Sequence, residues 1–182
     1  MTTSSGSGAW LRLAVPATLV SAVIGAFGVG FLVAMFAAFA VGAKPAGQTL
    51  GWINDALVLL SYLLAVPAAI ALGRLLRLRG PILSLVATAL GLVGIGAIVV
   101  FQFLLVIGVL TFEQEIGPAS IAFVALAAWL VMTGYLGRSS GVLPEGLRMG
   151  IVGATYIGYP IWAFWMSRQF ARLGATSAHA NA

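Results

Sequence analysis

The sequence has no cysteine, a single histidine and few charged residues. Without cysteine the chain can form no disulfide, thiolate nucleophile, iron–sulfur cluster or cysteine-based zinc site. The one histidine, His179, lies in the polar C-terminal segment, so no apolar run carries a histidine that could ligate haem or a transition metal. No lysine lies within an apolar run either, which excludes a retinal Schiff base. We therefore expect no cofactor, no metal site and no enzymatic activity.

Charged residues make up only 7% of the chain, whereas hydrophobic residues make up 62%. A soluble domain carries roughly a quarter of its residues as charges, so this composition indicates an integral membrane protein. The formal net charge of +5 would suggest nucleic-acid binding in a soluble protein. Here the basic residues lie at the ends of apolar runs, as is usual in membrane proteins. We expect the lipid bilayer to be the main partner, and no nucleic acid.

Five apolar runs are each long enough to cross a hydrocarbon core of about 30 Å. They predict an all-α membrane fold, a bundle of about five transmembrane helices joined by short loops. The first run is longer than the apolar region of a signal peptide, about 7–15 residues, so we expect it to be an uncleaved helix. The predicted helices cover residues 13–42, 54–73, 81–110, 118–137 and 148–167, within one domain (13–168) between polar tails at 1–12 and 169–182.

The boundaries of these helices are indicated by glycine and proline. Gly80-Pro81 and Gly117-Pro118 each combine a helix-ending glycine with a proline suited to the first position of the next helix. Pro67 and Pro160 lie within apolar runs, where we expect them to kink the helices.

The distribution of basic residues predicts the orientation, because positively charged loops stay on the cytoplasmic side. We expect the N-terminus on the cytoplasmic face of a bacterial inner (plasma) membrane and the C-terminus on the other face. This orientation places more basic residues on the cytoplasmic side than the reverse orientation does. The internal set is then Arg12, Arg74, Arg77, Arg79, Arg138 and Arg148, and the external set is Lys44, Arg168 and Arg172.

Small residues recur at intervals of four in three of the predicted helices. This spacing lets helix backbones approach closely in lipid, and we expect it to serve packing within the molecule rather than a dimer contact. Because four residues advance about 400° around a helix, such a row winds and cannot face one partner throughout. The helix-packing candidates are Ala26, Gly30, Ala34, Ser61, Ala65, Ala69, Gly150, Ala154 and Gly158.

Polar residues within apolar runs often mark functional sites in membranes. Asp55 and Gln102 are the candidates for a transport or polar site. At the start of the second predicted helix, Asn54 or Asp55 is also suited to cap that helix, and Gln102 is suited to an interhelical hydrogen bond. Glu113 and Glu115 fall in a predicted solvated loop.

The C-terminal part combines several helix-end motifs. Gly134-Tyr-Leu-Gly-Arg-Ser is followed by Gly141-Val-Leu-Pro, by Gly150 and Gly153, and by Gly158-Tyr-Pro-Ile-Trp. This segment resembles a family of uncharacterised bacterial polytopic membrane proteins, which implies a bacterial inner membrane and no assigned activity. The aromatic residues Tyr156, Tyr159, Trp162 and Trp165 are interpreted as an interfacial belt that anchors the last helix.

Two functions fit these features. The first is a non-enzymatic accessory or structural subunit that packs against a membrane-protein partner or forms a homo-oligomer, since the apolar runs carry no buried ionisable groups. The alternative is a small transporter or channel for an ion or small solute, which would use Asp55, Gln102 and the proline-kinked helices.

Overall fold

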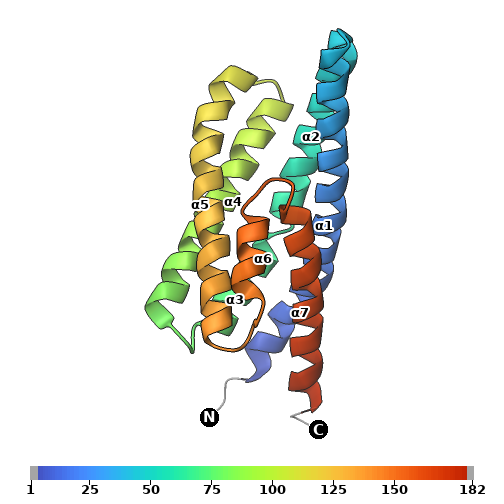
Figure 1. Ribbon diagram of the computed structural model, residues 1–182. Coiled ribbons are helices and arrows are strands. Elements are labelled where there is room, and N and C mark those ends of the chain that lie inside the picture. Colours follow the sequence, from blue (N-terminus) through green and yellow to red (C-terminus); the bar gives the residue numbers. More distant parts are fainter. Residues whose placement is uncertain (1–3, 180–182) are drawn as a thin grey trace.

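The computed structural model describes residues 4–179, and this part of the chain is helical with no strand. The helices are α1 (Ser4–Ala40), α2 (Lys44–Leu63), α3 (Val66–Leu76), α4 (Pro81–Val106), α5 (Phe112–Ser139), α6 (Gly146–Gly153) and α7 (Tyr159–His179). Four stretches are long and apolar enough to cross a membrane, namely Trp10–Ala40, Lys44–Leu76, Pro81–Val106 and Phe112–Ser139. The bundle in Figure 1 confirms the predicted all-α membrane fold.

Several helices begin earlier than predicted. Helix α1 already starts at Ser4, within the expected N-terminal tail, and α7 continues through the expected C-terminal tail to His179. Helix α2 starts at Lys44 because Pro45 occupies its first turn, where a missing N–H costs nothing. Pro81 does begin α4, as predicted. Gly117-Pro118, in contrast, lies inside α5 and marks no boundary.

The second membrane span is broken between α2 and α3. Pro67 lacks an N–H group and its ring clashes with the carbonyl four residues earlier, so a continuous helix cannot pass through it. Helix α2 therefore ends at Leu63 and α3 begins at Val66. Between them, the N–H of Ala65 donates to the carbonyl of Tyr62 at 3.0 Å. The predicted kink at Pro67 is therefore confirmed.

The predicted fifth helix, residues 148–167, is not a single helix. Helix α6 ends at Gly153, the chain reverses over residues 154–158, and α7 leads back to the end from which α6 came (Figure 1). A Cβ atom at Gly158 would collide with the carbonyl of Val152, and Gly158 N–H donates to Thr155 Oγ1 at 2.9 Å. A glycine and a local side-chain acceptor thus allow the reversal just before Pro160. We call α6, this tip and α7 the re-entrant hairpin.

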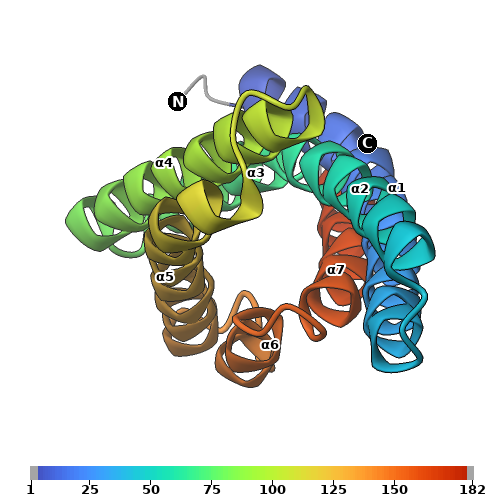
Figure 2. The same cartoon turned by 90° about the horizontal axis from the view of Figure 1, so that it is seen from above.

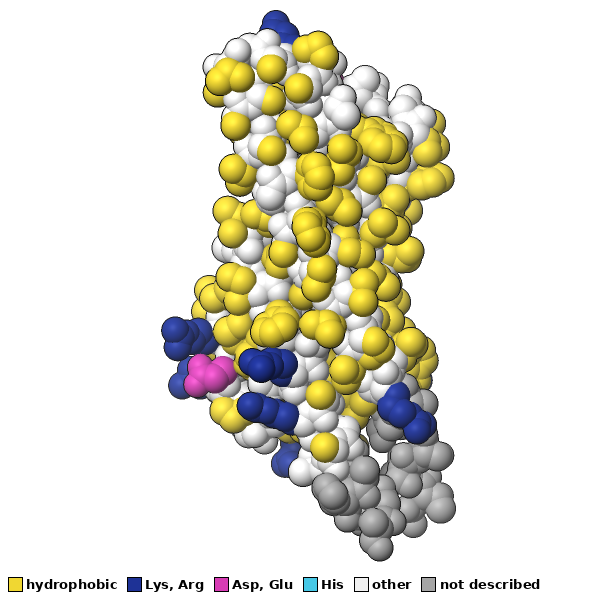
Figure 3. Space-filling model, turned by 90° about the vertical axis from the view of Figure 1, so that its right-hand side faces the viewer, with side chains coloured by type: hydrophobic (Ala, Val, Ile, Leu, Met, Phe, Trp, Pro, Cys, Tyr) yellow, Lys and Arg dark blue, Asp and Glu magenta, His cyan; other side chains and the backbone are white. Residues whose placement is uncertain are grey.

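The reversal changes the predicted topology. Both termini lie at the same end of the bundle (Figure 1), so the C-terminus is not on the opposite side as predicted. Arg168 and Arg172 consequently lie on the same side as the other arginines, whereas Lys44 lies at the opposite end, at the start of α2. Hydrophobic side chains cover the middle of the face shown in Figure 3, with Lys and Arg towards its two ends. We call the end that carries both termini the arginine end.

Seen from above, the helices are arranged around a central axis (Figure 2). Helix α5 lies across this axis from α2 and α7, and the three helices meet through aromatic side chains. Tyr62 of α2 packs against Phe123 of α5 with ring centroids 5.8 Å apart, and against Tyr159 of α7 at 4.7 Å. Aromatic side chains therefore fill the centre that the backbones leave open.

Candidate functional site

Glu115 is a buried carboxyl group near the start of α5. Thr111 precedes the helix as its N-cap, and its backbone N–H donates to the side chain of Gln114 at 2.9 Å, one half of a capping box. Two residues advance about 200° around a helix, so Glu113 and Glu115 point to opposite faces. Glu113 is exposed, but Glu115 is only 3% exposed. The predicted solvated loop at this position is therefore wrong.

Gln102 of α4 lies beside Glu115. The Gln102 side chain, 7% exposed, donates from Nε2 to Glu115 Oε1 at 3.0 Å, which is the expected interhelical hydrogen bond. Its other amide atom, Oε1, is buried without a hydrogen-bond partner. Asp55 lies on α2, which approaches the same end of α4 through the hydrogen bond that Trp52 Nε1–H donates to the carbonyl of Val106 at 3.0 Å. Because α2 begins at Lys44, Asn54 and Asp55 lie well inside the helix and do not cap it.

No basic side chain compensates these carboxyl groups. In residues 4–179, Glu115 bonds to Gln102 and Asp55 bonds to Asn54, and neither forms an ion pair. A charged carboxylate without a partner is costly in a medium of low dielectric constant. The group can avoid this cost by binding a proton or another cation.

The re-entrant hairpin continues this polar region towards the middle of the bundle. Tyr156 in the hairpin tip donates its hydroxyl to Asn54 Oδ1 at 2.8 Å, and Asn54 Nδ2 contacts Asp55 Oδ1 at 3.3 Å. Non-helical backbone at membrane depth is tolerated only where protein or water satisfies it, and broken helices often carry the binding sites of transporters. The tip of the hairpin therefore belongs to the candidate site.

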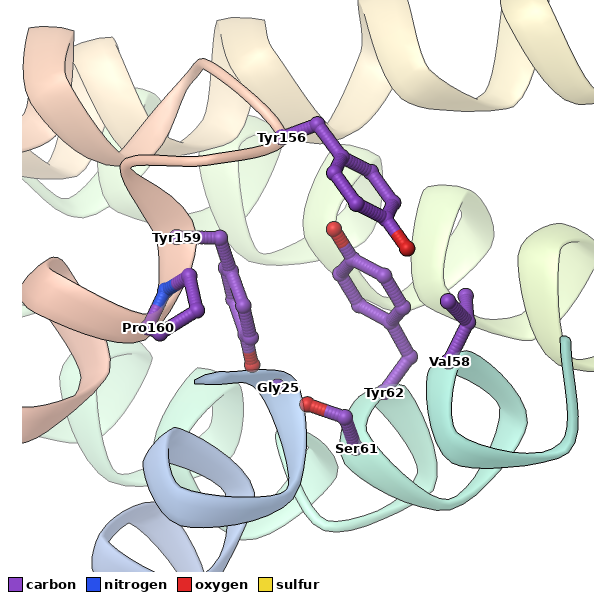
Figure 4. A pocket seen from close by; sticks show the side chains of 7 residues that line it. All are labelled: Gly25, Val58, Ser61, Tyr62, Tyr156, Tyr159 and Pro160. Carbon is purple, nitrogen blue, oxygen red and sulfur yellow. The ribbon is translucent and has the colours of Figure 1, made fainter. Parts of the chain in front are cut away.

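A second polar group joins three helices below the tip. Ser21 Oγ donates to the carbonyl of Ser61 at 2.8 Å, Ser61 Oγ donates to the carbonyl of Ser21 at 3.0 Å, and the Tyr159 hydroxyl lies 3.0 Å from Ser21 Oγ. Ser61 and Tyr159 border a small cavity, which has about 10 Å³ available to the centre of a water molecule, close to what one ordered water needs. Figure 4 shows its lining residues, Gly25, Val58, Ser61, Tyr62, Tyr156, Tyr159 and Pro160.

Together these residues form what we call the polar seam. It extends from the carboxyl groups near the end opposite the arginines to the cavity in the middle of the bundle. Its members are Ser21, Asn54, Asp55, Ser61, Gln102, Glu115, Tyr156 and Tyr159.

The half of the bundle on the arginine side of the seam is closed by large apolar side chains. Trp129 and Trp162 pack edge to face at 5.5 Å, directly beyond Tyr159, and both are buried. Leu72 and Phe170 are also almost fully buried. The indole N–H of Trp129 is buried there without an acceptor. Polar side chains therefore line only the half of the bundle away from the arginine end. Large apolar side chains fill the other half.

The helix-packing candidates fall into two groups. Ser61, Ala65, Ala69, Gly150 and Gly158 are buried, and Ala154 is half-buried, as packing would require. Ala26, Gly30 and Ala34 are exposed, and a Cβ at Gly30 would meet no atom within 4 Å. Along α1 the buried face shifts to Ser21, Gly25 and Gly28 because a row of residues four apart winds around the helix.

The structure places other site residues elsewhere than the sequence predicted. Tyr159 and Trp162 are each 2% exposed and lie inside the bundle, not in an interfacial belt. Glu115 was assigned to a loop, and Ser21 was not distinguished from its small neighbours. The available signal was the polar and helix-breaking set Thr155, Gly158 and Pro160, interleaved with Tyr156 and Tyr159, which is unusual for a simple membrane crossing.

The site offers carboxyl, amide and hydroxyl groups. In the described part of the chain no three His, Cys, Asp or Glu residues are grouped as a metal site. The four apolar spans show that the chain is an integral membrane protein. The chain matches no protein-family model, no curated protein and no solved structure, so its resemblance to a family of uncharacterised membrane proteins stays a prediction.

Proposed function

We propose that the protein is a small transporter in which Glu115 binds a proton from the membrane side opposite the arginine end. The observation that carries this proposal is Glu115, a buried glutamate that has no basic partner among the described residues and that accepts a hydrogen bond from an amide whose own oxygen is unsatisfied. Proton-binding carboxyl groups of this kind are typical of proton relays in pumps and transporters.

Protonation of Glu115 satisfies both members of the pair. The Gln102 Nε2–H group already donates to Glu115 Oε1. A protonated Glu115 gains an O–H group that can donate to Gln102 Oε1, the atom now without a partner. A buried acceptor left without a donor costs about 1–3 kcal/mol, so the neutral acid is favoured at this position.

The rest of the seam provides hydroxyl and amide groups beyond the acid. Asn54 and Tyr156 link the carboxyl region to the hairpin tip, and Tyr159 and Ser21 follow. For a proton to reach the arginine end, the contact between Trp129 and Trp162 must open. A movement of the re-entrant hairpin, which carries Trp162, provides such an opening and is the basis of an alternating-access mechanism.

The orientation follows from charge. With all arginines at one end and Lys44 at the other, the arginine end is assigned to the cytoplasm of a bacterial plasma membrane. Both termini are then cytoplasmic, and Glu115 faces the external side.

The accessory-subunit hypothesis was based on the absence of buried ionisable groups and on the abundance of alanine and glycine. Glu115, which is buried, removes the first of these arguments. We therefore place the transporter, which was the alternative from sequence, first.

The first experiment is a pH titration of the purified protein followed by infrared spectroscopy. We expect a carbonyl band of a protonated carboxylic acid in the wild type that is lost in Glu115→Gln. Glu113→Gln is the matched control, because it removes the same charge from the exposed face of the same helix and should leave the band unchanged. A band that persists in Glu115→Gln would show that Glu115 does not bind the proton.

The second experiment measures proton entry into liposomes that contain a pH-sensitive dye. The wild type should carry protons down a gradient, and Glu115→Gln should abolish this flux while Glu113→Gln retains it. An absence of flux in the wild type would overturn the transporter proposal and favour the accessory role, which a stoichiometric partner after gentle detergent extraction would then establish.

A further inference from the structure

A groove between α3 and α4 lies outside the polar seam, at the arginine end. Its volume is about 430 Å³, within the roughly 300–1,000 Å³ of small-molecule sites. One end carries Arg74 and Arg77, and the rest is lined mainly by Ile70, Ile82, Leu85 and Leu92. The groove thus combines a cationic end with an apolar length.

The two arginines are free to bind an anion. They are exposed, lie three residues apart near the end of α3, and form no ion pair within residues 4–179. The whole stretch from residue 56 to residue 112 contains no Asp or Glu that could compensate them. The Arg74 guanidinium lies 4.7 Å from the centre of the Trp10 ring, which holds it in place but leaves its charge uncompensated.

The apolar part of the groove extends along α4 into the membrane. From Ile82 to Leu92 the helix rises about 15 Å, which is half of a hydrocarbon core of about 30 Å. An acyl chain of one leaflet covers the same depth. The groove therefore has the length of a lipid tail and the charge of a site for its head group.

The floor of the groove is held by a hydrogen bond between the two helices and by one within α4. Ser84 Oγ donates to the carbonyl of Gly73 at 2.9 Å, and Thr88 Oγ1 donates to the carbonyl of Ser84 at 2.7 Å. A Cβ at Gly73 would collide with Thr88, so α3 and α4 are in close contact here. A groove with such a floor is already formed before its ligand arrives, which lowers the cost of binding.

We propose that this groove binds one anionic phospholipid from the leaflet at the arginine end. The phosphate lies against Arg74 and Arg77, since one guanidinium group can donate two parallel hydrogen bonds to phosphate oxygens. One acyl chain lies along Ile82, Leu85 and Leu92. This site is independent of the polar seam and of the proton that we assign to it.

Native mass spectrometry of the full-length protein from mixed micelles of phosphatidylglycerol and phosphatidylcholine tests this proposal. The wild type should retain one phosphatidylglycerol in preference to phosphatidylcholine. Arg74→Gln/Arg77→Gln should lose roughly thirtyfold in this preference, since each arginine near an anionic lipid contributes about a factor of five. Arg138→Gln/Arg148→Gln removes the same charge from the same end, outside the groove, and should keep the preference.

A second variant separates the groove from general surface charge. Leu85→Trp fills the apolar part, keeps every arginine and should also weaken retention of the lipid, as checked in protein that melts like the wild type. Equal retention of both lipids by the wild type, or an equal loss in both arginine pairs, would overturn the proposal. Displacement of the lipid by inorganic phosphate alone would also overturn it, because the site would then recognise the anion without the acyl chain.

Discussion

At the scale of single residues, the face of the helix decides which acidic group is buried. Glu113 and Glu115 look equivalent in the sequence, two acids in the polar stretch before Pro118. Only the start of α5 at Phe112 determines that they point in opposite directions, and this start depends on the capping contact of Thr111 with Gln114. The same holds for Asp55, whose place inside α2 follows from a helix start ten residues earlier than expected. The sequence could identify Gln102 as an interhelical donor, but not its partner.

The hydrogen bond between Gln102 and Glu115 should contribute measurably to stability. Gln102→Leu leaves Glu115 buried without its donor and should lower the free energy of unfolding in detergent by about 1–3 kcal/mol. The double variant Gln102→Leu/Glu115→Leu should lose less than the two single variants together, because no buried polar atom is then left unpaired. Additive losses in thermal melting would show that the two side chains are not coupled.

At the scale of helices, the prediction from sequence was most successful where length and composition alone decide. The four spanning stretches and the kink at Pro67 follow from apolar runs and from the chemistry of proline. The run at residues 148–167 has the same length and apolar character but reverses at its middle. This reversal depends on contacts with distant helices, including the hydrogen bond of Tyr156 to Asn54 and the contact of Tyr159 with Ser21. Such partners cannot be inferred from a local pattern.

Glycine has opposite roles in α1 and in the re-entrant hairpin. A Cβ at Gly150 would collide with the carbonyl of Leu130, and one at Gly134 with the carbonyl of Gly146, so α5 and α6 touch through their backbones. Gly150→Leu should therefore lower the free energy of unfolding by about 1–3 kcal/mol or more, the cost of overpacking.

Gly30→Leu is the matched control, because the same change points into open space. It should leave the thermal melting of the detergent-solubilised monomer unchanged. A larger loss for Gly30→Leu than for Gly150→Leu would contradict this assignment and show that the exposed face of α1 packs against another molecule.

At the scale of the whole molecule, charge and polarity are arranged along one axis. The arginine side chains lie at one end of the bundle. Glu115 lies about 35 Å from Arg138 along α5, close to the opposite surface of the bilayer. Between them, the polar seam covers the half near Glu115, and the packed tryptophans cover the other half. Under the proposed function, this asymmetric bundle is a state that the packed tryptophans close at the arginine end. The proposed lipid groove lies at the closed end, where the hairpin must move if the bundle opens.

The absence of cysteine makes this arrangement directly testable, because any introduced cysteine is the only thiol. Thr49→Cys in α2, Ser139→Cys at the end of α5 and Ala171→Cys in α7 all replace exposed side chains. With the arginine end in the cytoplasm, a membrane-impermeant maleimide should label Thr49→Cys in intact cells. Ser139→Cys and Ala171→Cys should react only after permeabilisation, because the re-entrant hairpin returns α7 to the side on which α5 ends. Labelling of Ala171→Cys together with Thr49→Cys would mean that residues 148–167 cross the membrane after all. Labelling of Ser139→Cys and Ala171→Cys alone in intact cells would keep the hairpin but reverse the orientation, and with it the side from which Glu115 takes its proton.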